Sequence, residues 1–95
     1  RPARTEGRIG GKMGDFSMAR EEFYRFMYEK FVSEDGPWCG RAEYEALCEA
    51  SKLVERARLF AADLGHITQN RFGWHRLTAQ GIAYAEDQGF AGRRK

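Results

Sequence analysis

Residues 52–85 read KLVERARLFAADLGHITQNRFGWHRLTAQGIAYA, and they carry the clearest structural pattern in this chain. Lys52–Leu64 repeats apolar residues at three- and four-residue steps, which predicts an amphipathic helix. The apolar face that we expect consists of Leu53, Ala57, Phe60 and Leu64, with Val54 and Ala61 beside it. Gly65 follows where the end of a helix favours a residue with positive φ.

The second half of this stretch predicts a β-ribbon and then another helix. His66-Ile67-Thr68 is short and partly β-branched, which is typical of a strand. Residues 70–74 include a glycine and carry turn chemistry. Residues 74–78 alternate bulky and polar side chains, like a half-buried return strand. Thr78 is then a candidate cap for a helix over Ala79–Asp87.

Large apolar residues recur on adjacent turns of Ser17–Val32, which predicts a first helix there. They are Phe23, Phe26, Met27 and Phe31, with Tyr24 and Tyr28 alongside. Such a stripe is typical of a core face. Ser33–Gly40 reads as a connector, because Asp35-Gly36-Pro37 is a turn cluster. Trp38 within it either covers the edge of the domain or anchors an interface.

A short acidic helix is predicted over Arg41–Ala50. Its apolar face holds Tyr44, Leu47 and Cys48, and its outer face holds Glu43, Glu45 and Glu49. Neither Gly nor Pro separates this helix from the next one. A break at Ser51 and a continuous helix into Lys52 therefore both remain open.

Composition places the chain among small folded proteins. Its 95 residues are 42% hydrophobic and 14% aromatic, which allows one domain with a small core. The net charge of +2 permits a nucleic-acid partner without requiring one. No apolar run approaches the roughly 20 residues of a membrane span. We therefore expect no membrane partner. Because two cysteines are too few for a disulfide scaffold, we expect a cytoplasmic protein.

The folded domain is predicted to cover residues 17–90. Residues 1–16 are rich in Gly and Arg and contain little that is apolar, so we expect a disordered basic arm or a remnant of an expression vector. Residues 91–95 read as a basic tail.

Two short motifs, in this order, resemble those of a winged helix-turn-helix domain. Leu64-Gly65-His66-Ile67 resembles the glycine-containing exit from a recognition helix. Leu77-Thr78-Ala79-Gln80-Gly81 is similar to the leucine-threonine, two residues, glycine step that leaves the wing in repressors of the multiple-antibiotic-resistance and phenolic-acid types. Small winged-helix proteins of phages and prophages look similar too. The resemblance covers Ser17–Gly89 and implies an α+β fold, a small winged-helix domain with three helices, a two-stranded β wing and a C-terminal helix.

In that family the third helix enters the major groove and the wing touches the DNA backbone. The resemblance therefore implies a transcriptional regulator that binds double-stranded DNA, with a homodimer as the expected assembly. The DNA contacts it implies in this chain are Lys52, Arg56, Arg58, Arg71 and Arg76.

The alternative is a phage- or plasmid-type accessory protein that binds another protein and not DNA. The chain has more large aromatic residues than a small core must hide, and surplus aromatics are typical of interfaces. The candidates are Tyr24, Tyr28, Trp38, Phe72 and Trp74, together with the acidic second helix.

We expect that the protein is not an enzyme and that it binds neither a cofactor nor a metal ion. Cys39, Cys48, His66 and His75 supply thiols and imidazoles, but their spacing differs from the close pairs of structural zinc sites. A cysteine nucleophile with a histidine base would also lack an oxyanion hole and an orienting acid at any recognisable spacing.

Overall fold

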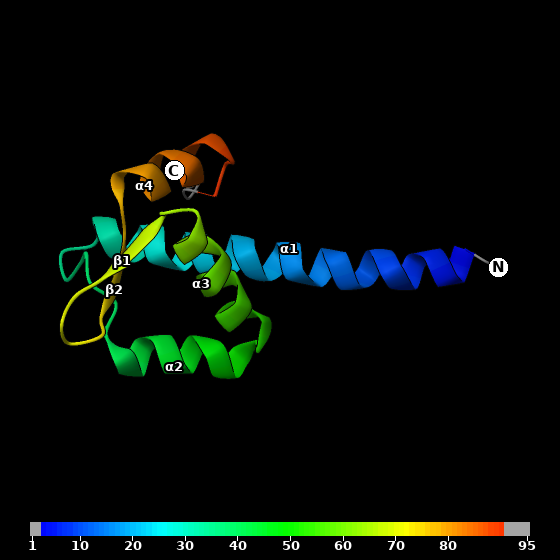
Figure 1. Ribbon diagram of the computed structural model, residues 1–95, viewed down its shortest axis with the longest axis horizontal. Coiled ribbons are helices and arrows are strands. Elements are labelled where there is room, and N and C mark those ends of the chain that lie inside the picture. Colours follow the sequence, from blue (N-terminus) through cyan, green and yellow to red (C-terminus); the bar gives the residue numbers. More distant parts are fainter. Residues whose placement is uncertain (1–2, 91–95) are drawn as a thin grey trace.

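The computed structural model describes the backbone of residues 3–90 and the side chains of residues 15–49 and 51–90 (Figure 1). Within these residues, four helices and a two-stranded antiparallel sheet form a small α+β domain. The helices are α1 (Ala3–Val32), α2 (Arg41–Ala50), α3 (Leu53–Asp63) and α4 (Ala79–Asp87), and the strands are β1 (Ile67–Gln69) and β2 (His75–Leu77). In Figure 1, α2 and α4 lie on opposite sides of α1 and α3.

The predicted order of elements is confirmed, and α2 and α4 have the predicted bounds. The question left open between α2 and α3 is also answered. Ser51 has an extended backbone, with φ of −154° and ψ of 119°, so the helix breaks there. Serine can break a helix without Gly or Pro, because its side chain favours alternative backbone hydrogen bonds.

The start of the first helix was predicted wrongly, since α1 begins at Ala3 and not at Ser17. The described part of the expected disordered arm is helical, and it extends away from the other elements in Figure 1. Adding residues to an existing helix avoids the cost of nucleation, so little apolar content is needed. The predicted basic tail, residues 91–95, lies outside the described residues.

The core lies between α1, α3, the ribbon and α4. α1 packs against α3, β2 and α4, while α2 packs against α3. The buried apolar side chains are Ala19, Phe23, Tyr24, Met27, Cys39, Val54, Ala57, Ala61, Ile67, Leu77 and Ala85. The aromatic stripe predicted on the first helix is therefore largely a core face, as expected. Phe90 also packs against this core after α4 has ended.

The predicted apolar face of α3 is rotated from the observed one. Phe60 and Leu64 are 39% and 43% exposed, and the side chains turned inward are those of Val54, Ala57 and Ala61. The separation of two packed helices depends on the side chains between them. Two alanines at the contact let α3 approach α1 closely, which moves the larger residues to the rim.

Phe60 lies at this rim. Its ring meets that of Phe16 edge-on, with centroids 6.0 Å apart. The Arg20 guanidinium lies 4.3 Å from the centre of the same ring. Phe60 therefore covers the junction of α1 and α3 and does not fill the interior.

The two glycine-containing motifs are in direct contact. Gly65 has a φ of 78°, and the chain turns there out of α3. Thr78 donates its hydroxyl to Gly65 O (2.7 Å) and its N–H to His66 O (2.8 Å). The same hydroxyl accepts the N–H of Gly81 (3.1 Å), which confirms Thr78 as the cap of α4. A Cβ on Gly81 would lie 2.1 Å from His66 O, so only glycine fits.

The ribbon pairs Ile67 with Leu77 and Gln69 with His75. Because side chains alternate across a strand, His75 faces the same side as the buried Leu77. The connector before α2 joins the sheet through Cys39, which exchanges backbone hydrogen bonds with His75 (2.7 and 3.1 Å). This bridge brings the first residue of α2 next to the ribbon.

We expect Phe23→Ala and Phe60→Ala to differ clearly in stability, although the chemical change is the same. Phe23 is fully buried, so its loss should leave a cavity and cost about 3–5 kcal/mol. Phe60 sits at the rim, so its loss should cost only about 1–2 kcal/mol. Urea denaturation followed by circular dichroism measures both, and equal losses would contradict the observed rotation of α3.

Gly81→Ala should destabilise the domain even though alanine favours helices by about 1 kcal/mol over glycine. The added methyl group would collide with the His66 carbonyl. The matched control is Ala83→Gly at an exposed position of the same helix, where propensity alone predicts a loss of about 1 kcal/mol. Thermal melts of both variants test this, and a more stable Gly81→Ala protein would refute the close approach.

Candidate functional site

The five cations predicted to contact DNA differ in exposure. Lys52, the N-cap of α3, and Arg56, one helical turn further on, are both exposed. Arg71 is exposed in the ribbon turn, with its guanidinium 5.2 Å from the centre of the Phe72 ring. Three of the five predicted cations are therefore available to a partner.

The other two each make one hydrogen bond within the chain. Arg76 is partly buried, and its guanidinium carbon lies 5.3 Å from the centre of the Trp38 ring. One terminal nitrogen of Arg76 donates a hydrogen bond to Leu77 O (3.0 Å). Arg58 turns toward α2, where its Nε donates to Tyr44 Oη (2.7 Å).

The aromatics predicted at an interface also separate into two groups. Tyr24 is fully buried and cannot contribute to a surface, because its place on α1 faces the core and its hydroxyl hydrogen-bonds His66 Nδ1 (2.6 Å). Tyr28 is partly buried and donates to Glu86 (3.0 Å). Phe72 and Trp74, by contrast, are 59% and 41% exposed.

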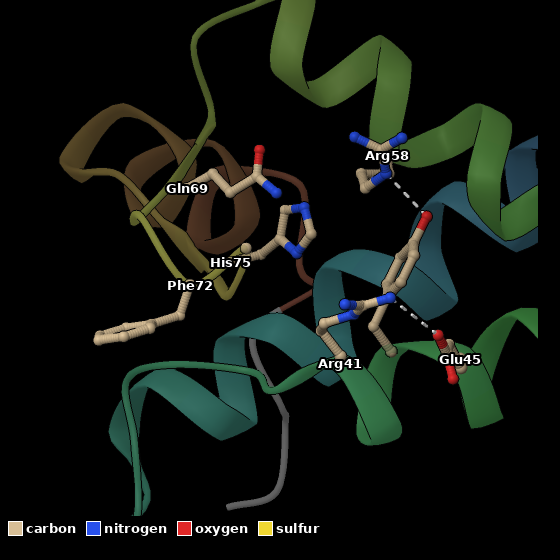
Figure 2. Close-up of a pocket in the computed structure, with 8 residues that line it drawn as sticks. Arg41, Glu45, Arg58, Gln69, Phe72 and His75 are labelled. Atoms are coloured by element: carbon tan, nitrogen blue, oxygen red, sulfur yellow. Dashed lines mark hydrogen bonds and ion pairs between the residues drawn. The ribbon is translucent and has the colours of Figure 1, made fainter.

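A cleft of about 460 Å³ opens between α2, α3 and the ribbon. Figure 2 shows its lining, in which the His75 ring points toward Arg58 while the Phe72 ring points away. The lining residues are Arg41, Tyr44, Glu45, Arg58, Gln69, Phe72, Gly73 and His75. The volume of the cleft is within the usual range for small-ligand sites.

Three elements meet at this cleft for separate reasons. The Cys39–His75 bridge holds the start of α2, and with it Arg41, beside β2. Strand alternation turns Gln69 and His75 to one side of the ribbon. Arg58 is on the flank of α3 between its buried and exposed sides. The site therefore depends on the tertiary arrangement and not on one local motif.

His75 is the unusual group of the cleft. It is only 7% exposed, and neither ring nitrogen has a hydrogen-bond partner among the described residues. Burial, and then the nearby Arg58 charge, lowers the pKa of His75. The ring is therefore neutral at pH 7, with one donor and one acceptor nitrogen. Leaving both unpaired is costly, since buried polar groups normally have partners.

The charges around His75 favour an anion. Arg58 uses only its Nε within the described residues, so its two terminal nitrogens remain available. Arg41 lies at the first turn of α2, with Glu45 3.8 Å away. The N-terminus of α2 adds the positive end of the helix dipole. Burial raises the pKa of Tyr44 to about 12, so its hydroxyl stays neutral and adds no negative charge.

The described residues bring no metal-ligating cluster together, and the Cys39 thiol is protonated. Within them, no three His, Cys, Asp or Glu side chains come together as metal ligands. Burial raises the pKa of Cys39 to about 11, which keeps that thiol protonated and unreactive. Across residues 3–90, no helix has both the length and the apolar character to cross a bilayer.

Sequence reasoning missed Arg41, Tyr44 and Gln69 as members of one site. Part of the signal was present, because alternation from the apolar Leu77 places His75 on the inward side of the ribbon. The bridge from Cys39 to His75 has no local signature, and it is this bridge that brings Arg41 near.

Comparisons with protein-family models, curated protein sequences and solved structures gave no match to this chain.

His75→Phe should leave the unfolding free energy at pH 7 unchanged or raise it by about 1 kcal/mol, because it removes two buried, unpaired nitrogens. The cleft also provides room for the slightly larger ring. A loss above about 2 kcal/mol in urea denaturation would mean that these nitrogens have partners in solution.

The same variant should flatten the pH dependence of stability. The folded-state pKa of His75 lies below that of an unfolded histidine, about 6.5. As pH falls below that value, the unfolded chain binds the proton first, so stability is full above it and declines beneath it. Urea denaturation at pH 7.5, 6.5 and 5.5 should show a smaller decline for His75→Phe. His66 contributes a remaining decline, because burial lowers its pKa as well.

Proposed function

We propose that this protein is a small winged-helix DNA-binding protein, with α3 as the reading helix and the β1–β2 ribbon as the wing. The element order supports this proposal, as does the Cys39 bridge that adds a third strand-like segment to the ribbon. The observation that carries it is the placement of exposed cations on two neighbouring elements. Lys52 and Arg56 are exposed at the N-cap and in the first half of α3, and Arg71 is exposed in the ribbon turn.

The charge distribution along α3 suits a reading helix that uses its first half. Winged and related helix-turn-helix proteins contact base edges mainly with the N-terminal residues of this helix. Lys52 is the N-cap of α3 and Arg56 lies in its first half, while Asp63 ends the helix. Glu55 lies between the two cations, where a carboxylate can accept a hydrogen bond from cytosine N4.

The set of proposed contacts is smaller than the sequence implied. Arg58 and Arg76 already have partners in the chain, so their release would add a cost to binding. Lys52, Arg56 and Arg71 have no such restraint among the described hydrogen bonds. Arg71 at the tip of a two-stranded wing is suited to a phosphate or to a narrow minor groove.

A protein partner is the second candidate, and one observation favours it. Phe72 and Trp74 form an exposed aromatic pair in the ribbon, with ring centroids 5.7 Å apart. Exposed aromatic pairs are typical of interface anchors. The acidic helix α2 contributes less than expected to this candidate, because Glu43 is held by Lys30 (2.7 Å) and by the N–H of Gly40 (3.0 Å).

The first proposal predicts salt-dependent binding to duplex DNA. Replacing Lys52, Arg56 and Arg71 together by Gln should reduce the slope of log K against log salt by about 2–3, since each phosphate contact contributes about 0.9. Fluorescence anisotropy with a labelled random duplex at several salt concentrations measures this slope.

Arg25→Gln is the matched control, because Arg25 lies on α1, pairs with Glu21 and takes no part in the proposed contacts. It should leave the slope unchanged. If the unaltered protein does not bind duplex even at low salt, the DNA proposal fails and the Phe72–Trp74 pair becomes the leading site.

A further inference from the structure

The cleft between α2, α3 and the ribbon has features that the proposed DNA contacts do not use. It holds a cation on each of two helices, Arg41 and Arg58, and an imidazole on the ribbon. His75 is more than nine-tenths buried and points into this space with both nitrogens unpaired among the described residues (Figure 2). A polar group in this state indicates a missing partner.

We propose that this cleft binds a free phosphate group, either inorganic phosphate or the phosphate of a small phosphorylated molecule. Arg58 supplies its two free terminal nitrogens, His75 supplies an N–H, and Arg41 adds charge at the rim beside the N-terminus of α2. These donors come from three elements and approach the cleft from different sides.

The arrangement of donors distinguishes phosphate from a carboxylate. A carboxylate presents two oxygens in one plane, which one guanidinium edge satisfies. A phosphate monoester presents three strong acceptor oxygens in different directions. Donors spread over α2, α3 and the ribbon match the second geometry. A phosphate that keeps one proton can also donate to the acceptor nitrogen of His75, so both of its unpaired nitrogens would gain a partner.

The net charge of the lining is consistent with this ligand. Arg41 and Arg58 outweigh Glu45, which lies a loose 3.8 Å from Arg41 on the exposed side of α2. Phosphate at the N-terminus of a helix is a recurrent arrangement, because the backbone N–H groups and the helix dipole both favour negative charge. The buried imidazole of His75, with two unpaired nitrogens, is a second feature that indicates a ligand here, in addition to the helix N-terminus.

This inference does not require the protein to bind DNA. The residues it uses, Arg41, Arg58 and His75, differ from the proposed DNA contacts. Loss of one activity can therefore be observed while the other remains.

The test is a titration of ¹⁵N-labelled protein with inorganic phosphate, followed by the NMR signals of the His75 ring and of Arg58 Nε–H. Chloride at matched ionic strength is the first control. We expect a saturable shift with phosphate and none with chloride. Arg58→Gln and His75→Phe should each weaken phosphate binding at least about tenfold, as expected for one lost charge-assisted hydrogen bond. Arg25→Gln, with the same change in net charge, should bind phosphate normally.

Folding is checked separately, because a variant that unfolds would lose binding trivially. His75→Phe keeps the test informative if Arg58→Gln unfolds, because the unpaired nitrogens of His75 contribute nothing to stability within the chain. The proposal is overturned if phosphate gives no saturable shift, or if both cleft variants bind phosphate normally. It is also overturned if Arg25→Gln weakens binding equally. Finally, shifts that appear with a short DNA duplex and not with inorganic phosphate would assign the cleft to the DNA backbone.

Discussion

The domain depends on the contact between two glycine-containing turns. Gly65 ends α3 and leaves two carbonyl groups, its own and that of His66, facing the start of α4. Thr78 meets both carbonyls and also caps α4 through Gly81. Because Gly81 has no side chain, the α4 backbone can lie directly against the His66 carbonyl. One threonine thereby joins the end of α3, the end of β2 and the beginning of α4.

This contact explains how so short a ribbon keeps its position. Two three-residue strands are not stable by themselves in water. Here Thr78 holds one end, Ile67 and Leu77 bury the inner side, and Cys39 pairs with the strand from its other edge. The ribbon is therefore rigidly placed beside α3. α2 meets the ribbon through the short connector and through the Tyr44 ring, whose centroid lies 5.2 Å from that of the His75 ring, and the cleft opens beside this contact.

The two buried histidines show what separates a structural polar group from a candidate site. His66 shares a hydrogen bond with Tyr24 and packs against the Tyr84 ring, at 4.6 Å between centroids. Its Nδ1 is paired within the core, and no nitrogen of this ring is both buried and unpaired among the described residues. His75 has similar burial and also packs against an aromatic ring, that of Tyr44, but its ring nitrogens have no hydrogen-bond partner among the described residues. It also lies beside Arg58, so two unpaired ring nitrogens and a positive charge occur in one place.

Local sequence determined the order of the elements, because periodicity, caps and glycine positions act within a few residues. It thus predicted the bounds of α2 and α4, the positive φ of Gly65 and the cap at Thr78. It did not determine the rotation of α3, since hydrophobicity favours Phe60 as the core residue while close packing on α1 favours Ala57 and Ala61. The cleft was decided by tertiary structure alone. Its residues come from separate elements joined by the Cys39–His75 pairing, and no local period records which residues meet across such a distance in the chain.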